Sequence, residues 1–208
     1  MVYSLVIALL VCYLLGNLNG AVCISALMHD DVRSHGSGNA GLTNFIRNYG
    51  EGRALYVILI DAGKAYLACL TAGALLTPYG FGLEGMAIGG LAVMLGHDFP
   101  ALLGFRGGKG ILSGLFISLA MDWRVSLLIL AVFLLAYLTT KYVSLGSVLA
   151  AVTFSVSFGL LYRENLTVLL CTAAMGLLTV FMHRENILRL LKGQERKTEL
   201  FHQKKKDV

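Results

Sequence analysis

Four short polar segments interrupt an otherwise apolar chain, and they hold the residues that could do chemistry. They are rich in Gly, Asn, Ser, His and cationic side chains, and they read HGSGNAGLTNFIR (35–47), GHDFPALLGFRGGKG (96–110), KYVSLGS (141–147) and HREN (183–186). Such residues are unfavourable beside lipid unless they contact something polar. If the apolar elements between them bring all four segments to one side of a membrane, the segments can form a single site.

The first segment has the composition of an anion-binding loop. Gly-rich backbone that leads into a helix presents N–H groups, which can hold a phosphate or a developing oxyanion. Neutral donors and one cation accompany the glycines, and an arginine can bind phosphate through two parallel hydrogen bonds. The alternative is an ordinary Gly/Asn loop between two helices, since GSGN alone is a weak motif. The candidate residues are Ser37, Asn39, Thr43, Asn44 and Arg47.

The second segment ends in a glycine-rich run around one lysine. The run lacks the spacing of a nucleotide-binding P-loop, because Ile111 stands where a hydroxyl would be expected and no strand precedes it. We therefore expect phosphate capture by Lys109 and the amides of Gly107 and Gly108, with a structural loop as the alternative. His97 could serve as a base or as a hydrogen-bonded structural residue.

Three further groups of polar residues allow both a functional and a structural interpretation. Asp61 and Lys64 are three residues apart on one helical face, so they can neutralise each other or position a phosphate. Ser144 and Ser147 can cap a helix or bind a phosphate oxygen. The last group could equally be solvated at a membrane interface: His183, Glu185 and Asn186.

The composition indicates an integral membrane protein. Of the 208 residues, 57% are hydrophobic and 14% are charged, and the mean hydropathy is +0.74, whereas soluble domains carry roughly 25% charged residues. We expect one membrane domain over residues 1–196 and a basic cytoplasmic tail over 197–208. Much of the positive charge behind the net charge of +5 lies between Arg189 and Lys206, beside the last apolar span, where it favours contact with anionic lipid and not with nucleic acid. Four scattered cysteines suggest no metal site, and no cofactor motif is evident.

The apolar runs predict an all-α protein with seven transmembrane helices. Residues 110–140 hold two of them, because one helix of this length would reach about 46 Å and would bury the charged turn at 122–124. Seven spans place the four polar segments on one side, and fourteen of the seventeen Lys and Arg residues lie in or beside them. That side is then cytoplasmic, with the N-terminus outside and the C-terminus inside. The expected spans are 2–28, 54–77, 82–103, 111–121, 125–140, 143–162 and 166–182.

In this order and spacing, the four segments resemble the PlsY-type family of acyl-phosphate:glycerol-3-phosphate acyltransferases. The run DAGK at 61–64 also resembles the motif of that family's second helix, and the resemblance covers residues 1–196. It implies a seven-helix enzyme of the bacterial inner membrane that needs no metal or cofactor. The implied reaction moves a fatty acyl group from acyl phosphate to the 1-hydroxyl of sn-glycerol 3-phosphate. The products are lysophosphatidate and phosphate, made in phospholipid synthesis.

The resemblance also implies roles for individual residues. Ser37, Asn39, Thr43, His183 and Asn186 match catalytic positions, while Arg47, Lys109, Ser144, Gly107 and Gly108 match positions that bind substrate phosphate. Supporting positions are Asn44, Asp61, Lys64, His97 and Glu185. Leu42 departs from the alanine usual in the first motif. Implied partners are acyl phosphate, glycerol 3-phosphate, membrane lipids and the enzyme that makes acyl phosphate.

Two other classes of membrane protein remain as alternatives. A small transporter for an anionic metabolite would also use cations and broken helices. Against it, the polar residues gather at one face, and no inverted repeat is evident in the sequence. A structural membrane subunit would leave the four motifs unexplained.

Overall fold

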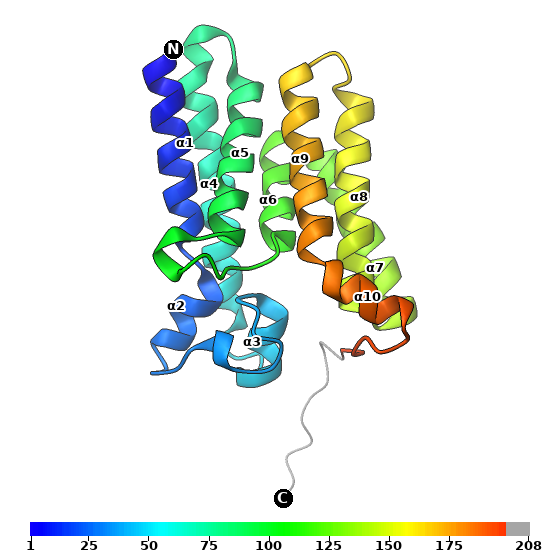
Figure 1. The fold of residues 1–208 in the computed structure, drawn as a ribbon. Helices are drawn as coiled ribbons and strands as arrows, with labels where there is room; N and C mark the ends of the chain where they lie inside the picture. Colours follow the sequence, from blue (N-terminus) through cyan, green and yellow to red (C-terminus); the bar gives the residue numbers. More distant parts are fainter. Residues whose placement is uncertain (199–208) are drawn as a thin grey trace, which may run out of the picture.

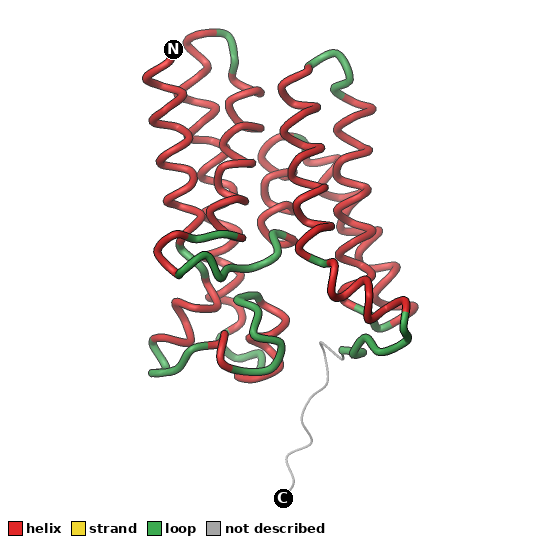
Figure 2. The backbone as a smooth tube through the Cα atoms, viewed as in Figure 1, coloured by secondary structure: helices red, strands yellow, loops and turns green. Residues whose placement is uncertain are grey.

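The computed structural model describes residues 1–198, and all regular structure in this part of the chain is helical (Figure 2). Short 3-10 turns at Val32–Ser34, Thr77–Tyr79 and Ala101–Leu103 join some of the helices. The helices are α1 (Val2–Asn17), α2 (Gly20–Ala26), α3 (Leu42–Tyr49), α4 (Ala54–Leu76), α5 (Gly82–Asp98), α6 (Ile111–Met121), α7 (Trp123–Thr140), α8 (Val143–Leu161), α9 (Leu166–Met182) and α10 (Arg184–Leu191).

The lengths and composition of the helices fit a multi-pass membrane protein. Four helical segments are long and apolar enough to cross a membrane: α4 and α5, each extended by the 3-10 turn that follows it, and α7 and α8. The pairs α1–α2 and α9–α10 also qualify when each is taken as one span, with bends of 46° and 55°. Helix α6 is apolar but has only 11 residues. The described helices thus include four to six spans by length, which confirms the all-helical membrane class.

The spanning helices form two groups with α6 between them. Helices α1, α4 and α5 pack together, and α8 packs against both α7 and α9. Helix α6 contacts members of both groups, which also meet directly through α5 and α9 (Figure 1). Glycines allow close approach: a Cβ atom at Gly96 of α5 would lie 2.1 Å from the Tyr13 carbonyl oxygen of α1. Such contacts between small residues are typical of membrane helices, which gain little from burying apolar surface against one another.

The predicted division of residues 110–140 into two helices is confirmed. Helix α6 ends at Met121, and Asp122 caps α7 by accepting a hydrogen bond from the Arg124 amide. The Arg124 guanidinium and the Tyr162 hydroxyl also donate to the Asp122 carboxylate, at 2.6 Å and 3.0 Å. The charges of this turn therefore satisfy each other at the end of the bundle.

Three regions differ from the predicted spans. The first span bends at 18–19, where Asn19 caps a separate helix α2 by accepting from the Val22 amide. The polar stretch after it contains the short helix α3, whose Phe45 is fully buried. The HREN segment begins another short helix, α10. Polar residues between the spans thus form amphipathic helices, which the apolar pattern alone did not reveal.

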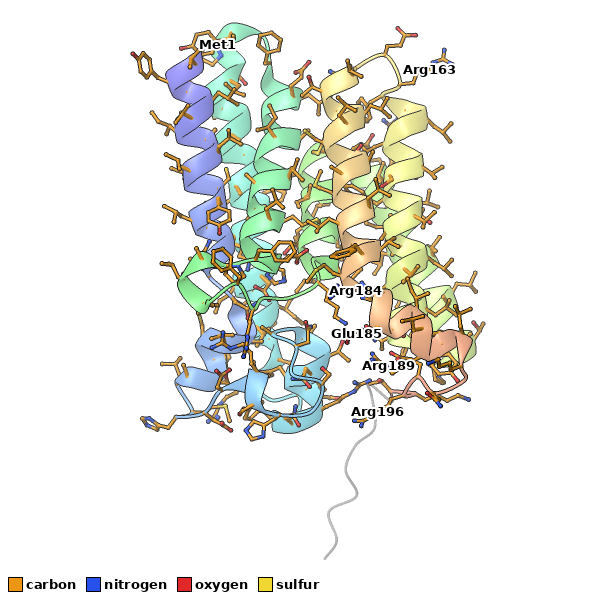
Figure 3. The ribbon with its side chains drawn as sticks, in the orientation of Figure 1. Met1, Arg163, Arg184, Glu185, Arg189 and Arg196 are labelled. Carbon is orange, nitrogen blue, oxygen red and sulfur yellow. The ribbon has the colours of Figure 1, made fainter. Side chains whose placement is uncertain are left out.

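The polar segments gather at one end of the bundle. Helices α2, α3 and α10 lie at that end, whereas the N-terminus and the α4–α5 and α8–α9 turns lie at the other (Figure 1). Arg184, Glu185, Arg189 and Arg196 likewise lie at the end opposite Met1 and Arg163 (Figure 3). We call the end that carries these segments the polar end.

Candidate active site

A cavity of about 960 Å³ opens at the polar end, and all four polar segments contribute to its lining. Twelve of the predicted site residues line it, whereas Lys64, Gly107 and Gly108 do not. The twelve are Ser37, Asn39, Thr43, Asn44, Arg47, Asp61, His97, Lys109, Ser144, His183, Glu185 and Asn186. The arrangement of the helices thus brings together residues that are almost 150 positions apart in sequence.

Asn44 organises the loop before α3. Its side-chain amide donates to the backbone oxygens of Val32, His35 and Asn39 at 3.0–3.1 Å, and its Oδ1 accepts from the Ser37 amide at 3.0 Å. Asn44 itself is buried. These bonds wrap the loop around one side chain and leave Ser37 exposed at the cavity wall.

Gly36 fits this loop for two reasons. Its φ of +61° lies in the left-handed region that favours glycine. A Cβ atom there would also lie 2.4 Å from the Asn44 Oδ1 atom. The glycine therefore permits both the turn and the close approach of the asparagine, and the loop keeps its backbone close to the cavity.

Lys109 brings a cation to the cavity from the second segment. Its ammonium donates to Asn186 Oδ1 at 2.5 Å. Burial lowers the pKa of Lys109, and the positive charge of Arg189 acts in the same direction. The lysine is thus held beside the last segment, in surroundings that favour an anion close to its ammonium group.

The structure corrects the expectation that the amides of Gly107 and Gly108 face a phosphate. Neither glycine lines the cavity, and the Gly108 amide donates to the His97 carbonyl oxygen at 3.0 Å. A Cβ atom at position 107 would lie 2.0 Å from that oxygen, and one at position 108 would lie 2.1 Å from His97 Nε2. The glycines let the loop pack against His97, so that the next residue, Lys109, reaches the cavity.

Asp61, Lys64 and His97 form a buried polar cluster at the wall of the cavity. The Lys64 ammonium lies 2.8 Å from both Asp61 Oδ1 and His97 Nδ1. It also donates to the backbone oxygens of Gly16 and Leu18, and the Gly20 amide donates to Asp61. Asp61 and Lys64 neutralise each other, and they provide hydrogen-bond partners for backbone groups at the α1–α2 break. These contacts favour the structural interpretation of all three side chains.

The last segment positions Asn186 between two charged groups. Its Oδ1 accepts from Lys109, and its Nδ2 donates to Glu195 Oε1 at 2.7 Å. His183 is buried, with Nδ1 2.8 Å from the Thr179 carbonyl oxygen. Glu185 is largely exposed, and its carboxylate is 3.9 Å from the Arg189 guanidinium. Asn186 therefore couples the second segment to the chain that follows α10.

Four residues of the site were missed in the sequence. Glu195 accepts from Arg189 Nε at 2.7 Å, and Thr198 accepts from Arg47. Arg189 and Arg196 also line the cavity. Burial raises the pKa of Glu195, but hydrogen bonds from neighbours such as Asn186 and Arg189, together with the positive charge of Arg189, leave it lowered. Arg189 follows Asn186 by three positions on one helical face, which was a usable signal, whereas the acidic Glu195 was hidden in a basic run.

Neither serine of the third segment caps its helix. The N-cap of α8 is Tyr142, which makes no side-chain capping bond. Ser147 donates back to the Val143 carbonyl oxygen at 2.9 Å. Ser144 is buried and lines the cavity, so of the two interpretations its position fits ligand contact better than capping.

The inner part of the cavity is apolar. Leu112 and Leu115 of α6, Ile129 of α7, Phe154 of α8 and Met175 of α9 line it. We call this part the apolar arm. A cavity with cations and amides at its mouth and hydrocarbon inside suits a ligand with an anionic head and an aliphatic tail. Within residues 1–198, no group of three His, Cys, Asp or Glu side chains is placed to hold a metal ion.

Comparison with known proteins decides the family. Residues 6–193 match the family model described as glycerol-3-phosphate acyltransferase. The chain belongs to this family. A glycerol-3-phosphate acyltransferase of Finegoldia magna is 40% identical over 195 residues, which cover 93% of this chain and 96% of the relative. One of Clostridioides difficile is 38% identical, with coverage of 94% and 96%.

Solved structures agree with the assignment of the chain to the glycerol-3-phosphate acyltransferase family. The glycerol 3-phosphate form of PlsY, an integral membrane glycerol 3-phosphate acyltransferase, superposes with a TM-score of 0.83 at 33% identity, covering 94% of this chain and 96% of PlsY. The lysophosphatidic acid form gives 0.80 at 32% identity, with coverage of 95% and 96%. The family resemblance, the enzyme class and the membrane class inferred from the sequence are thus confirmed.

Proposed function

We propose that the enzyme transfers a fatty acyl group from acyl phosphate to the 1-hydroxyl of sn-glycerol 3-phosphate. The products are lysophosphatidate and inorganic phosphate. The observation that carries the proposal is the shape of the cavity, in which a mouth with Arg47 and Lys109 leads into the apolar arm. Both substrates bring phosphate to such a mouth, and only the donor brings a tail for the arm.

The proposed reaction needs no covalent enzyme intermediate, because acyl phosphate is already activated as a mixed anhydride. The 1-hydroxyl oxygen attacks the acyl carbon, and the bond from that carbon to the phosphate oxygen breaks. The hydroxyl proton passes to the departing phosphate. Arg47 and Lys109 hold the phosphate groups, while Asn39 and backbone amides of the first loop stabilise the tetrahedral oxyanion. Catalysis then rests on positioning and electrostatics.

The other predicted residues have roles around this centre. We propose that Ser37, Thr43, Ser144, His183 and Asn186 contact the substrates. Asn44 orders the first loop, and Asp61, Lys64 and His97 support the cavity wall. The bonds that hold Asn44 and Lys64 support these assignments. Glu185, which is largely exposed, adds negative charge beside Arg189.

We further propose seven crossings of a bacterial inner membrane, with the N-terminus outside and the C-terminus and the cavity mouth facing the cytoplasm. The excess of Lys and Arg at the polar end supports this orientation. Glycerol 3-phosphate would enter from water, and acyl phosphate would arrive from the enzyme that makes it. Residues 1–196 form the catalytic domain in this proposal. The basic tail at 197–208 lies outside the described residues from position 199 on.

Purified protein in lipid nanodiscs, supplied with acyl phosphate and glycerol 3-phosphate, tests the proposal. We expect equal amounts of lysophosphatidate and phosphate, and no product when acyl-CoA replaces acyl phosphate. Lys109→Ala should lower kcat/KM at least tenfold. The matched control, Arg163→Ala, removes a cation from the opposite end of the bundle (Figure 3) and should leave the rate unchanged. Absence of product, together with substrate uptake into liposomes, would instead favour the transporter. An acyl group trapped on Ser37 would overturn the direct transfer.

A further inference from the structure

The apolar arm ends at one level of the bundle. Helices α8 and α9 reach this level with Phe154 and Met175, the lining residues farthest from the polar end on each helix. Helices α6 and α7 reach it with Leu115 and Ile129. Phe154, Met175 and Ile129 are also members of the main hydrophobic core. Phe154, Met175, Ile129 and Leu115 are therefore the deepest lining side chains of helices α8, α9, α7 and α6, and we call these four the floor.

The bundle is solid beyond the floor. Phe158, one turn further along α8, is fully buried and packs edge-on against Phe154, with ring centroids 5.0 Å apart. Ile117 and Val125 are also essentially inaccessible to solvent. A chain that reaches Phe154 thus meets packed core on the far side, and protein cores do not yield space without repacking.

The floor lies at a definite depth. Ser144 lines the mouth and Phe154 the floor, and they are ten residues apart on the same helix. At about 1.5 Å per residue, the arm is about 15 Å deep along α8. A donor whose phosphate is held at the mouth must therefore fit its tail into this length, and longer tails must bend or displace the floor.

We propose that Phe154 is a specificity-determining residue that sets the preferred length of the acyl chain. The inference rests on the proposed acyl transfer. Phe154 is the largest side chain of the floor and is 4% exposed, so its ring closes the arm. Ala150 lies one turn nearer the mouth on the same helix, is almost fully buried and lines the arm. A larger side chain at position 150 would shorten the arm, whereas a smaller one at position 154 would lengthen it.

Competition between acyl phosphates that differ by two methylene groups tests the inference. For Phe154→Ala and the milder Phe154→Leu, we expect kcat/KM for the longer donor relative to the shorter one to rise roughly tenfold, as burial of two methylenes predicts. Ala150→Leu should change the ratio in the opposite direction. Phe158→Ala is the matched control, because it removes a buried ring of the same helix behind the floor and should leave the ratio unchanged.

The outcomes separate this inference from the proposed function. If the wild-type protein makes no lysophosphatidate from any acyl phosphate, the proposed function fails. If the wild-type protein makes lysophosphatidate and all four variants share its chain-length profile, Phe154 does not set the length of the acyl chain and the inference is overturned. Thermal unfolding of each variant in nanodiscs identifies those that fail to fold, and the smaller change Phe154→Leu then carries the comparison.

Discussion

At the scale of single residues, the site depends on polar side chains that hold backbone in place. Asn44 uses both donors and its acceptor oxygen within one loop. Asn186, which is half-buried, donates to Glu195 and accepts from Lys109. A buried side-chain amide is stabilising only while every partner is present, because a buried polar group without a hydrogen bond lowers the free energy of unfolding.

Asn44→Ala should therefore disorder the first loop. The substitution leaves the Ser37 amide and three backbone oxygens without this partner, at about 1–3 kcal/mol for each group that stays buried. We expect a loss of activity of at least tenfold together with a lower unfolding temperature. Asn48→Ala is the control, because that side chain is exposed and its amide donates only to Asn44. Equal effects of the two substitutions would contradict a special role for Asn44.

The pH dependence of glycerol 3-phosphate binding should report on Lys109. Its pKa is lowered by burial, so the charged form that attracts phosphate is present at low pH and is lost as pH rises through this lowered value. We expect KM for glycerol 3-phosphate to rise on the alkaline side at a pH below that at which a free lysine titrates. In Lys109→Arg the charge persists, so the alkaline rise should disappear. Parallel profiles for both proteins would assign the titration elsewhere.

The residue types predicted which residues line the site better than they predicted the contacts of each residue. The polar residues were identifiable because they stand out in an apolar chain, and twelve of them line the cavity. The contacts of Gly107 and Gly108 could not be predicted, since packing against His97 depends on how the loop folds back. Thr198 was missed because its partner Arg47 is distant in sequence, and Glu195 was missed because it stands in a basic run.

At the scale of elements, the break between α1 and α2 depends on a neighbouring helix. Lys64 and Asp61 of α4 bond to the backbone of residues 16, 18 and 20 across the break. An irregular backbone within a membrane protein is tolerated where protein groups satisfy its hydrogen bonds. The apolar run at 2–28 therefore predicted one span and not two helices, because the groups that bond to the bend lie on another helix.

Lys64→Met should destabilise the fold strongly. It leaves the buried Asp61 carboxylate without its cation, which typically lowers the free energy of unfolding by about 3–5 kcal/mol. The double variant Asp61→Leu with Lys64→Met removes both charges and should recover part of this loss. Thermal unfolding in detergent measures both effects. Gly63→Ala, where an added Cβ atom meets no other group within 4 Å, should unfold as the wild type does; a double variant less stable than Lys64→Met would contradict the charge argument.

At the scale of the whole molecule, the gathering of the polar segments at one end depends on the turn at 122–124. Because α6 and α7 are separate helices, the polar segments lie at one end of the bundle (Figure 1). Sequence reasoning reached this arrangement from helix length and charge. It did not reach the bends or the interfacial helices, since those depend on contacts between elements.

Labelling of single cysteines tests the orientation. In a background without the four native cysteines, Arg163→Cys should react with a membrane-impermeant maleimide in intact cells, because the Arg163 side chain is 79% exposed at the end proposed to face outward. Lys192→Cys, beyond α10 at the polar end, should react only after the membrane is permeabilised. The reverse pattern would invert the topology, and labelling of both in intact cells would contradict the parity of seven crossings.

The joining of a charged mouth to an apolar arm has a consequence for how the enzyme's kinetics must be expressed. An acyl donor with its tail among lipids is diluted in two dimensions, so its effective concentration is a mole fraction of the bilayer. Glycerol 3-phosphate remains a solute of the aqueous phase, with an ordinary molar concentration. Adding inert lipid at constant bulk volume should therefore slow the enzyme by surface dilution of one substrate alone.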